Sequence, residues 1–148
     1  MGRHADVETS ADGHTVKRHL HVACAIIEQE GKVLTAQRSS TMSLPLKWEF
    51  PGGKIETDES PEECLSRELM EELGVNVVIG TALSPATHSY ADFTVTLYPF
   101  ICRQAGGVIT AYEHHALQWI EPHRLPELDW ADADLPVISE YMTMTRAS

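Results

Sequence analysis

The chain reads GKIETDESPEECLSRELMEELGV over residues 53–75, and no other part of its 148 residues is as informative. Eight carboxylates fall within residues 56–72, a span of 17 residues. The same span carries apolar side chains at the spacing of one helical face: Leu65, Leu69, Met70 and Leu73. We therefore expect an amphipathic acidic helix whose apolar stripe packs against a hydrophobic core.

Capping residues define the limits of this helix. Ser60 is a favourable N-cap, Pro61 suits the first helical position, and Glu63 completes a capping box with Ser60. Gly74 can adopt the left-handed conformation in which many helices end. The sequence therefore predicts that the helix begins at Pro61 and stops before Gly74.

Three glutamates converge on one face of the predicted helix, because Glu68, Glu71 and Glu72 stand at i, i+3 and i+4. A hard divalent cation would relieve their repulsion, since magnesium prefers carboxylate oxygen and shares its other positions with water and substrate phosphates. The alternative is a solvated acidic face, which suits Glu62 and Glu63 near the helix N-terminus. It does not suit Glu71 and Glu72 in the last turn, where the helix dipole disfavours carboxylates. We interpret the helix as a metal-carrying element.

Nine residues match the signature of the Nudix hydrolase family at every specified position: Gly53, Glu59, Arg67, Glu68, Leu69, Glu71, Glu72, Gly74 and Val75. The chain resembles MutT-type members from about residue 22 to residue 142. This resemblance implies an α/β fold, the Nudix α/β/α sandwich with a central mixed β-sheet. We expect that domain over residues 19–148, after a flexible, polar N-terminal tail over residues 1–18.

Hydrophobic patterns outside the acidic helix predict five strands, at residues 20–27, 32–37, 75–79, 93–103 and 117–120. The first two form a hairpin, residues 38–46 form a loop, and Gly106-Gly107 is a turn. Leu135, Ile138 and Met142 fit the buried face of a terminal helix. Strands interspersed with two helices are typical of a layered α/β domain.

The family resemblance implies roles for residues in and before the acidic helix. Glu68, Glu71 and Glu72 would be the main metal ligands, together with the backbone carbonyl of Gly52. Arg67 would orient Glu68 through a charge-assisted contact. Glu59, also counted among the catalytic residues, would support the loop before the helix, with contact to a second ion through water as a further role. The expected ion is Mg²⁺, with Mn²⁺ as the alternative.

The general base is predicted in a later loop. Some relatives place a metal-binding glutamate there, and Glu113 occupies a comparable position before the strand at residues 117–120. We therefore expect Glu113 to be a metal ligand or the base. His114 and His115 are the alternative bases, although loop histidines are usually solvated.

The substrate-binding residues are predicted around residues 38–54. Arg38 follows the second strand, where MutT-like proteins carry a phosphate-binding arginine, and Lys47 and Lys54 are minor candidates for phosphate contacts. Gly53 permits close backbone approach. The segment WEFPGG at residues 48–53, which includes Glu49 and Phe50, resembles the LEFPGG form of MutT-type members. This extension favours a nucleoside triphosphate as substrate.

Asp134 is the main candidate for base recognition. MutT-type proteins carry an asparagine at this point that bonds to oxidised guanine, so the aspartate departs from the pattern. A carboxylate accepts from the exocyclic amine of cytosine, whereas a protonated Asp134 would still donate to an oxidised purine. Capping of the terminal helix also explains an aspartate here. Tyr90, Phe93 and Tyr98 are candidates to line the base pocket, and core packing is their alternative role.

The expected function is Mg²⁺-dependent hydrolysis of nucleoside triphosphates to a monophosphate and pyrophosphate. Oxidised or non-standard nucleotides, above all 8-oxo-dGTP, are the favoured substrates, and CTP, dCTP or 5-methyl-dCTP are the alternative. A non-catalytic nucleotide-sensing module is the alternative from another class. It is disfavoured because such modules usually lose an acidic ligand, and all are present here.

Composition limits the possible partners and compartment. The net charge of −11 argues against nucleic-acid polymers and anionic membranes as partners. Cys24, Cys64 and Cys102 are odd in number and widely spaced, which predicts buried free thiols in a reducing compartment. We expect a cytoplasmic protein that is a monomer or a weak homodimer.

Overall fold

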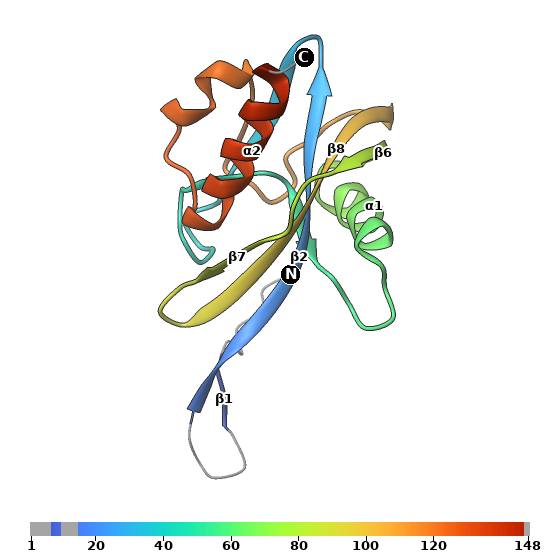
Figure 1. Ribbon diagram of the computed structural model, residues 1–148. Helices are drawn as coiled ribbons and strands as arrows, with labels where there is room; N and C mark the ends of the chain where they lie inside the picture. Colours follow the sequence, from blue (N-terminus) through green and yellow to red (C-terminus); the bar gives the residue numbers. More distant parts are fainter. Residues whose placement is uncertain (1–6, 10–14, 147–148) are drawn as a thin grey trace.

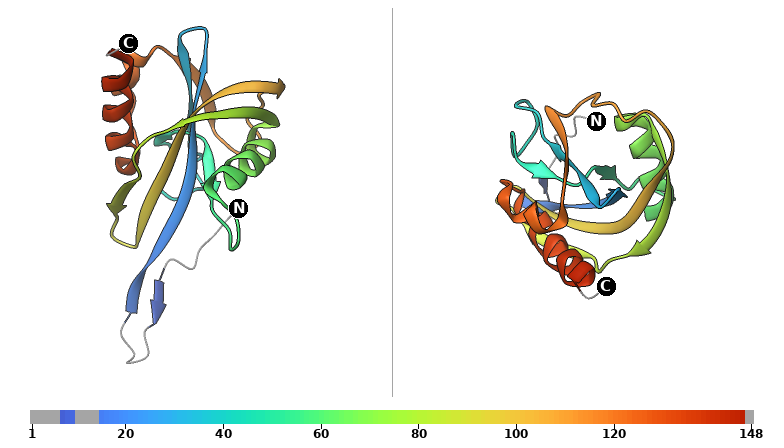
Figure 2. Two further views of the ribbon diagram at one scale, coloured as in Figure 1. Left: turned by 45° about the vertical axis from the view of Figure 1, so that its right-hand side comes forward. Right: turned by 90° about the horizontal axis from the view of Figure 1, so that it is seen from above.

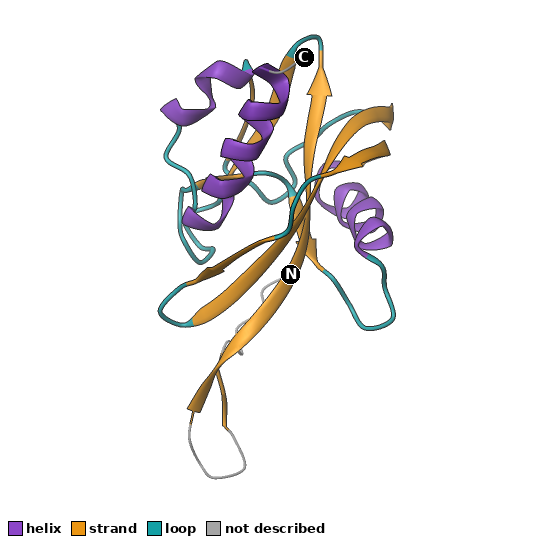
Figure 3. Ribbon diagram, viewed as in Figure 1, coloured by secondary structure: helices purple, strands orange, loops and turns teal. Residues whose placement is uncertain are grey.

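A mixed β-sheet separates two helices in the computed structural model, which describes residues 7–9 and 15–146 (Figure 1). The predicted α/β architecture, a central mixed sheet between helices, is confirmed. In chain order the elements are β1 (Val7–Thr9), β2 (Thr15–Gln29), β3 (Lys32–Gln37), β4 (Trp48–Glu49), β5 (Gly52–Lys54), α1 (Pro61–Leu73), β6 (Val75–Ala82), β7 (Ala86–Ser89), β8 (Phe93–Gly107), β9 (Ala116–Ile120), the 3₁₀ helices η1 (Pro122–Glu127) and η2 (Asp132–Asp134), and α2 (Leu135–Arg146). Figure 3 distinguishes the two helical layers from the strands between them.

The long strands β2 and β8 form the centre of the sheet. They run parallel, in register from Arg18 opposite Phe93 to Ile27 opposite Cys102. β5 pairs antiparallel with the middle of β2, and β3 pairs antiparallel with its C-terminal end. The second view of Figure 2 shows α1 and α2 on different sides of these strands. Both faces of the central strands are therefore covered, as is typical of parallel pairing.

One hydrophobic core lies between the sheet and α1. Successive side chains of β2 point to opposite faces, and Ala23, Ala25 and Ile27 point to this one. They pack against the stripe of α1, in which Leu65, Leu69 and Leu73 are fully buried. Because the two alanines are small, α1 lies close to β2.

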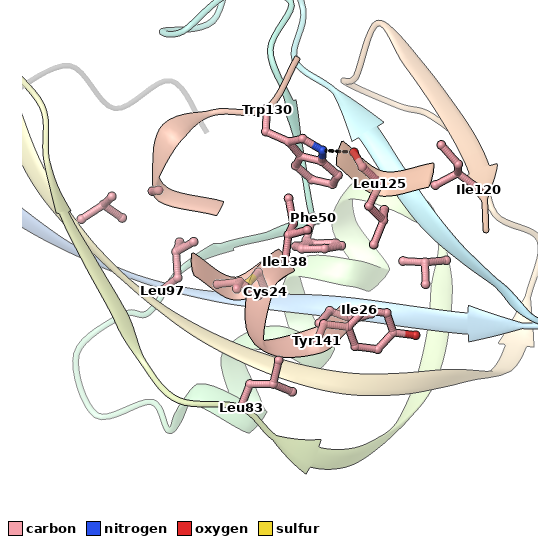
Figure 4. Packing of buried hydrophobic residues seen from close by; sticks show 14 residues of the cluster. Cys24, Ile26, Phe50, Leu83, Leu97, Ile120, Leu125, Trp130, Ile138 and Tyr141 are labelled. Atoms are coloured by element: carbon pink, nitrogen blue, oxygen red, sulfur yellow. Dashed lines mark hydrogen bonds between the residues drawn. The ribbon is translucent and has the colours of Figure 1, made fainter. Parts of the chain in front are cut away.

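The second core lies between the sheet and α2 (Figure 4). Cys24 and Ile26 of β2 contribute to it, together with Phe50, Ile138 and Tyr141. The ring of Phe50 lies 4.9 Å from that of Trp130, whose indole Nε1–H donates to the carbonyl oxygen of Leu125 at 2.7 Å. This core also holds the segment before α2 against the sheet.

The predicted capping of α1 is confirmed at both ends. The Ser60 hydroxyl accepts from the N–H of Glu63, and the Glu63 carboxylate accepts from the N–H of Ser60. Gly74 has a φ of 69° and closes the helix in the left-handed conformation. Met70 does not belong to the buried stripe, because it is 42% exposed. The buried face is shifted relative to the prediction, because it excludes Met70 and includes Cys64, Glu68 and Glu72.

Three other expectations about local structure differ from what is observed. The boundary of the predicted N-terminal tail falls inside β2, which begins at Thr15; residues 1–6 and 10–14 lie outside the described residues. Gly106 and Gly107 are not a turn, because they pair with Asn76 and Val75 at the end of β8. Ile138 is buried as predicted and Met142 is half-buried, but Leu135 is exposed, and α2 buries Val137 and Tyr141 as well.

The predicted free thiols are buried as expected, at Cys24, Cys64 and Cys102. No helix among the described residues is long and apolar enough to span a lipid bilayer.

Candidate active site

A cavity of about 590 Å³ opens beside β2 and β5. Its walls come from the loop after β3, from β4 and β5, from β8, and from the segments before β9 and α2. Twelve of the sequence-predicted residues line it: Arg38, Glu49, Phe50, Gly52, Gly53, Lys54, Glu72, Tyr90, Phe93, Glu113, His114 and Asp134. Residues predicted from distant parts of the chain therefore share one cavity.

Arg67 is the centre of the polar contacts around α1. Its Nε and Nη2 donate to the two carboxylate oxygens of Glu59, at 2.7 and 2.9 Å. Its Nη1 donates to Glu68 at 2.8 Å and more weakly to Glu71 at 3.3 Å. The predicted contact between Arg67 and Glu68 is present, and the guanidinium joins the start of the helix to its acidic face.

Glu59 belongs to the same network at the loop before α1. The bonds from Arg67, with a smaller contribution from the N–H of Glu56, lower the pKa of Glu59 to about 2. Glu59 is therefore an ionised anchor for the loop, which agrees with the structural role expected for it.

We expect Arg67→Lys to lower the free energy of unfolding by about 1–3 kcal/mol, because one ammonium group cannot replace the planar fork that holds Glu59 and Glu68. Urea denaturation would measure this change. Arg124→Lys is the matched control, since Arg124 pairs with Glu127 at the surface and should change stability by less than about 0.5 kcal/mol. Equal effects of the two variants would contradict a special role of Arg67.

The two glycines before α1 permit close packing of the loop. A Cβ on Gly53 would lie 2.1 Å from Cδ of Glu68, inside its carboxylate. A Cβ on Gly52 would lie 1.9 Å from the carbonyl oxygen of Ala23 in β2. The side chain of Glu68 therefore lies directly over Gly53, and only glycine leaves space for it.

Glu72 is the least satisfied polar group in this part of the protein. Its side chain is buried, and its Oε1 has no hydrogen-bond partner. Burial, followed by the charges of Glu68, Glu49 and Glu113, raises the pKa of Glu72 to about 8. An orphaned carboxylate oxygen of this kind is expected where a cation binds.

The donor set fits a hard divalent cation, since it consists of the carboxylates of Glu68, Glu71 and Glu72 and the carbonyl of Gly52. The side chains are not pre-arranged around one point: in residues 7–9 and 15–146, no three acidic, histidine or cysteine side chains form a ready cluster. Two of these carboxylates, those of Glu68 and Glu71, accept hydrogen bonds from Arg67.

The loop between β8 and β9 crosses the C-terminal end of α1. The N–H groups of Thr110 and Tyr112 donate to the last carbonyls of the helix, those of Leu73 and Glu72, at 2.9 and 3.3 Å. Glu113 follows directly and lines the cavity from an exposed position. The predicted loop glutamate is therefore on the same cavity as Glu72.

His114 is buried, which corrects the expectation of a solvated histidine. Its side chain is only 2% exposed, and its Nε2 lies 2.9 Å from Oε2 of Glu49. Glu49 binds the guanidinium of Arg38 through its other oxygen, at 2.7 Å. Of the two histidines in this loop, only His115 is exposed, as expected.

The predicted phosphate-binding cations have different positions. Arg38 lines the cavity, but it is held by Glu49 and by the carbonyl oxygen and hydroxyl of Ser43. Lys54 also lines the cavity. Lys47 does not, because it extends away to Asp129 at 2.8 Å, so its predicted contact with phosphate is not supported.

Asp134 lines the part of the cavity that is formed by the segment before α2. This side chain is buried and accepts from the N–H of Phe50 at 3.1 Å. Burial, with the charge of Glu49 as the second cause, raises the pKa of Asp134 well above its ordinary value. Asp134 therefore lies in the pocket as a buried carboxyl group.

Two of the three predicted aromatics line the pocket. The ring of Tyr90 contacts that of Phe93 in a tilted arrangement with centroids 5.0 Å apart, and its hydroxyl accepts from the N–H of Ala133 at 2.9 Å. Tyr98 is not in the pocket, because it lies on the other face of β8 and bonds to His21. The alternation along β8 separates Phe93 from Tyr98 and could have excluded Tyr98 from the sequence alone.

The loop after β3 is the part of the cavity that sequence reasoning missed. Ser39, Thr41, Met42, Ser43 and Leu44 line it. Leu44 and Leu46 both have positive φ, at 51° and 62°. No pattern of residue types signals this path, since leucine rarely adopts such a conformation.

The comparisons with known proteins agree with this fold and site. The NUDIX domain model matches residues 17–141. CTP pyrophosphohydrolase of Escherichia coli K12 is 35% identical over 86% of this chain and 95% of its own length. An 8-oxo-dGTP diphosphatase of Proteus vulgaris is 41% identical over 57% of this chain and 77% of its own length. The solution structure of the E. coli ORF135 protein superposes with a TM-score of 0.76 at 34% identity, covering 88% of this chain and 93% of that one.

The chain therefore belongs to the NUDIX domain family. It is a Nudix hydrolase, an enzyme that acts on nucleotides.

Proposed function

We propose that the protein is a Mg²⁺-dependent nucleoside triphosphate pyrophosphohydrolase, which releases a nucleoside monophosphate and pyrophosphate. One observation carries the proposal: a single cavity joins the carboxylate of Glu72 and the backbone at Gly53 to the buried Asp134 and the N–H of Phe50. Glu72 and the backbone at Gly53 suit a metal-bound polyphosphate, whereas Asp134 and the N–H of Phe50 suit a nucleobase. A nucleoside triphosphate has both parts.

The polyphosphate end rests on Glu68, Glu71, Glu72 and the Gly52 carbonyl as ligands of Mg²⁺, with Mn²⁺ as the second candidate. When bound, the ion would neutralise phosphate charge and lower the pKa of a coordinated water. Arg67 keeps Glu68 oriented. Glu113 is the proposed base or additional ligand, because its loop is tied to the end of α1.

Arg38 and Lys54 are the proposed phosphate contacts at the rim. Lys54 follows Gly53 directly, so its cation is close to the metal-binding end. Arg38 would have to exchange at least part of its contact with Ser43 for a phosphate oxygen. Such an exchange costs little, because both partners are partly exposed to water.

The base end rests on Asp134 as a neutral acid. A protonated carboxyl presents one donor and one acceptor side by side. This pair matches N3 and the exocyclic amine of cytosine, and it also matches O6 and the N7–H of 8-oxoguanine. It does not match unmodified guanine at the same edge, where O6 and N7 are both acceptors.

We favour a cytosine nucleotide as the substrate, which reverses the order of the two candidates expected from the sequence. The support comes from the relative named CTP pyrophosphohydrolase, whose similarity covers 95% of its length. 8-oxo-dGTP is the second candidate, supported by a relative named 8-oxo-dGTP diphosphatase with 41% identity over a shorter stretch. The two candidates share the chemistry at the metal and differ only at Asp134.

A panel of CTP, dCTP, 5-methyl-dCTP, dGTP and 8-oxo-dGTP with Mg²⁺ tests the proposal. We expect pyrophosphate release, with the highest kcat/KM on a cytosine nucleotide and the lowest on dGTP. A preference for 8-oxo-dGTP would select the second candidate. Absence of pyrophosphate release across the panel would leave the nucleotide-sensing module as the explanation.

We expect Asp134→Asn to lower kcat/KM far less than Asp134→Leu, because an amide also offers one donor beside one acceptor. The leucine variant should lose about 10- to 150-fold on the preferred nucleotide, the effect of one bidentate base contact. Steady-state kinetics on both variants would measure this. Equal losses would show that Asp134 supports the fold and does not recognise the base.

A further inference from the structure

Two buried side-chain atoms lack a hydrogen-bond partner in the described part of the chain, and both belong to residues that line the cavity. They are Oε1 of Glu72 and Nδ1 of His114. A buried polar atom without a partner costs about 1–3 kcal/mol, so native proteins rarely keep one without a reason. The proposed metal accounts for Glu72. It does not account for His114.

The neighbours of His114 determine which of its ring nitrogens carries the proton. Glu49 presents Oε2 to Nε2 at 2.9 Å, and its other oxygen binds the cationic Arg38. An ionised carboxylate only accepts, so Nε2 must be the donor. In the neutral imidazole, Nδ1 is then an acceptor that faces no protein donor.

Three hydrogen bonds fix the position of His114, two of them formed by nearby residues of its loop and one by its own ring. Its chain neighbour His115 donates from its N–H to the carbonyl of Gln37 in β3 at 2.8 Å. On the other side, Tyr112 is bonded to the carbonyl of Glu72 at the end of α1. The ring itself is held by Glu49. An acceptor held in this way is pre-organised for a ligand.

His114 is linked through hydrogen bonds to segments that reach both parts of the cavity. Glu49, its partner, precedes Phe50, whose N–H contacts Asp134 at the base end. The loop of His114 begins at the carbonyl of Glu72 at the metal end. The part of a nucleotide between its base and its phosphates is the sugar, and the donors of a sugar are its hydroxyl groups.

We propose that Nδ1 of His114 accepts a hydrogen bond from a sugar hydroxyl of the bound nucleotide, while its Nε2–H holds Glu49 in place against Arg38. The inference rests on the proposed function, since it requires a nucleotide in this cavity. It makes His114 a residue that senses the sugar, not the base that activates water.

Binding of non-hydrolysable nucleotides tests the inference without turnover. The probes are α,β-methylene analogues of CTP and 8-oxo-GTP and their 2′-deoxy, 3′-deoxy and 2′,3′-dideoxy forms, titrated with Mg²⁺ by calorimetry. Wild-type protein should lose about 3- to 10-fold in affinity when the recognised hydroxyl is removed, as expected for one hydrogen bond. The two monodeoxy probes distinguish the 2′ from the 3′ hydroxyl.

Two substitutions distinguish the roles of the two ring nitrogens of His114. In His114→Gln the amide can still donate to Glu49, but no acceptor remains at the place of Nδ1, so the preference for the hydroxyl should disappear. In His114→Asn an acceptor remains near that place, so part of the preference should persist even though the contact with Glu49 is lost. His115→Gln is the matched control at an exposed neighbour, and it should bind like wild type.

Several results would overturn the inference. Wild-type affinities that are the same with and without sugar hydroxyls would do so without any variant. An equal loss for all probes in His114→Gln would mean a purely structural role. Wild-type binding in that variant, with reduced kcat and an altered acidic limb of the pH–rate profile, would make His114 the base. If wild-type protein neither binds these probes nor releases pyrophosphate, the proposed function fails and this inference fails with it.

Discussion

Glu72→Gln is expected to lower kcat/KM by about 10³-fold at saturating Mg²⁺, on whichever nucleotide the wild-type enzyme prefers. The substitution keeps the shape of the side chain but removes the charge that a cation needs, and metal-borne charge stabilisation is worth several kcal/mol. Pyrophosphate release measures the loss of activity, and titration with Mn²⁺ measures the loss of metal affinity.

The matched control is Glu62→Gln, which removes an exposed carboxylate from the first turn of the same helix. Its activity should stay within about twofold of wild type, because surface substitutions away from the site have small effects. If the two variants retain the same activity, Glu72 does not belong to the catalytic centre.

Glu72→Gln should also remove a pH dependence of the metal-free fold. The pKa of Glu72 is raised from 4.5 to about 8 in the folded protein. Between these values the unfolded chain releases a proton that the folded chain keeps, so this group makes the free energy of unfolding decrease as pH rises. Below about 4.5 and above about 8 it contributes no slope. Urea denaturation between pH 5 and 8 should show that the free energy of unfolding decreases less with rising pH in Glu72→Gln than in the wild-type protein.

Gly53→Ala is expected to lower kcat/KM by about 10²-fold and the free energy of unfolding by about 1–3 kcal/mol. The added methyl group would overlap the carboxylate of Glu68, at 2.1 Å from its Cδ, so Glu68 or the loop must move. A displacement of about 1 Å at a catalytic group is sufficient for a loss of this size. Steady-state kinetics and urea denaturation measure the two effects.

Gly106→Ala is the control for the general cost of replacing a glycine in this sheet. A Cβ there would meet only the amide nitrogen of Asn76, at 3.9 Å, which is an ordinary contact. Activity and stability should change little, and lower chain entropy in the unfolded state could even stabilise the variant. If both variants lose activity to the same extent, a special role of Gly53 is contradicted.

Local sequence was sufficient for the acidic helix and for most strands. Ser60, Glu63 and Gly74 cap α1 as predicted, because capping depends on hydrogen bonds within a few residues of the chain. The strand at residues 32–37 was predicted with its observed limits. The predictions failed for Met70 and Leu135, whose exposure depends on which elements pack against the helix and not on helical spacing.

The environment of single polar residues required the tertiary structure. His114 seemed an ordinary loop histidine, but the fold brings it to Glu49, which is 65 residues away in the chain. For Asp134 the sequence left base recognition and helix capping both open, whereas the fold buries its side chain beside Phe50 in the cavity. Both outcomes depend on long-range contacts, which no local pattern of residue types encodes.

The sequence by itself determined the chemistry that this protein can carry out, since the type and spacing of its acidic residues specify a helix suited to a hard metal ion. The three-dimensional arrangement decided which other residues share a cavity with that helix, and which of them are buried. The physical reason is the range of the interactions: capping and helical periodicity act over a few residues, whereas burial, pKa shifts and pocket walls arise only when distant segments pack together.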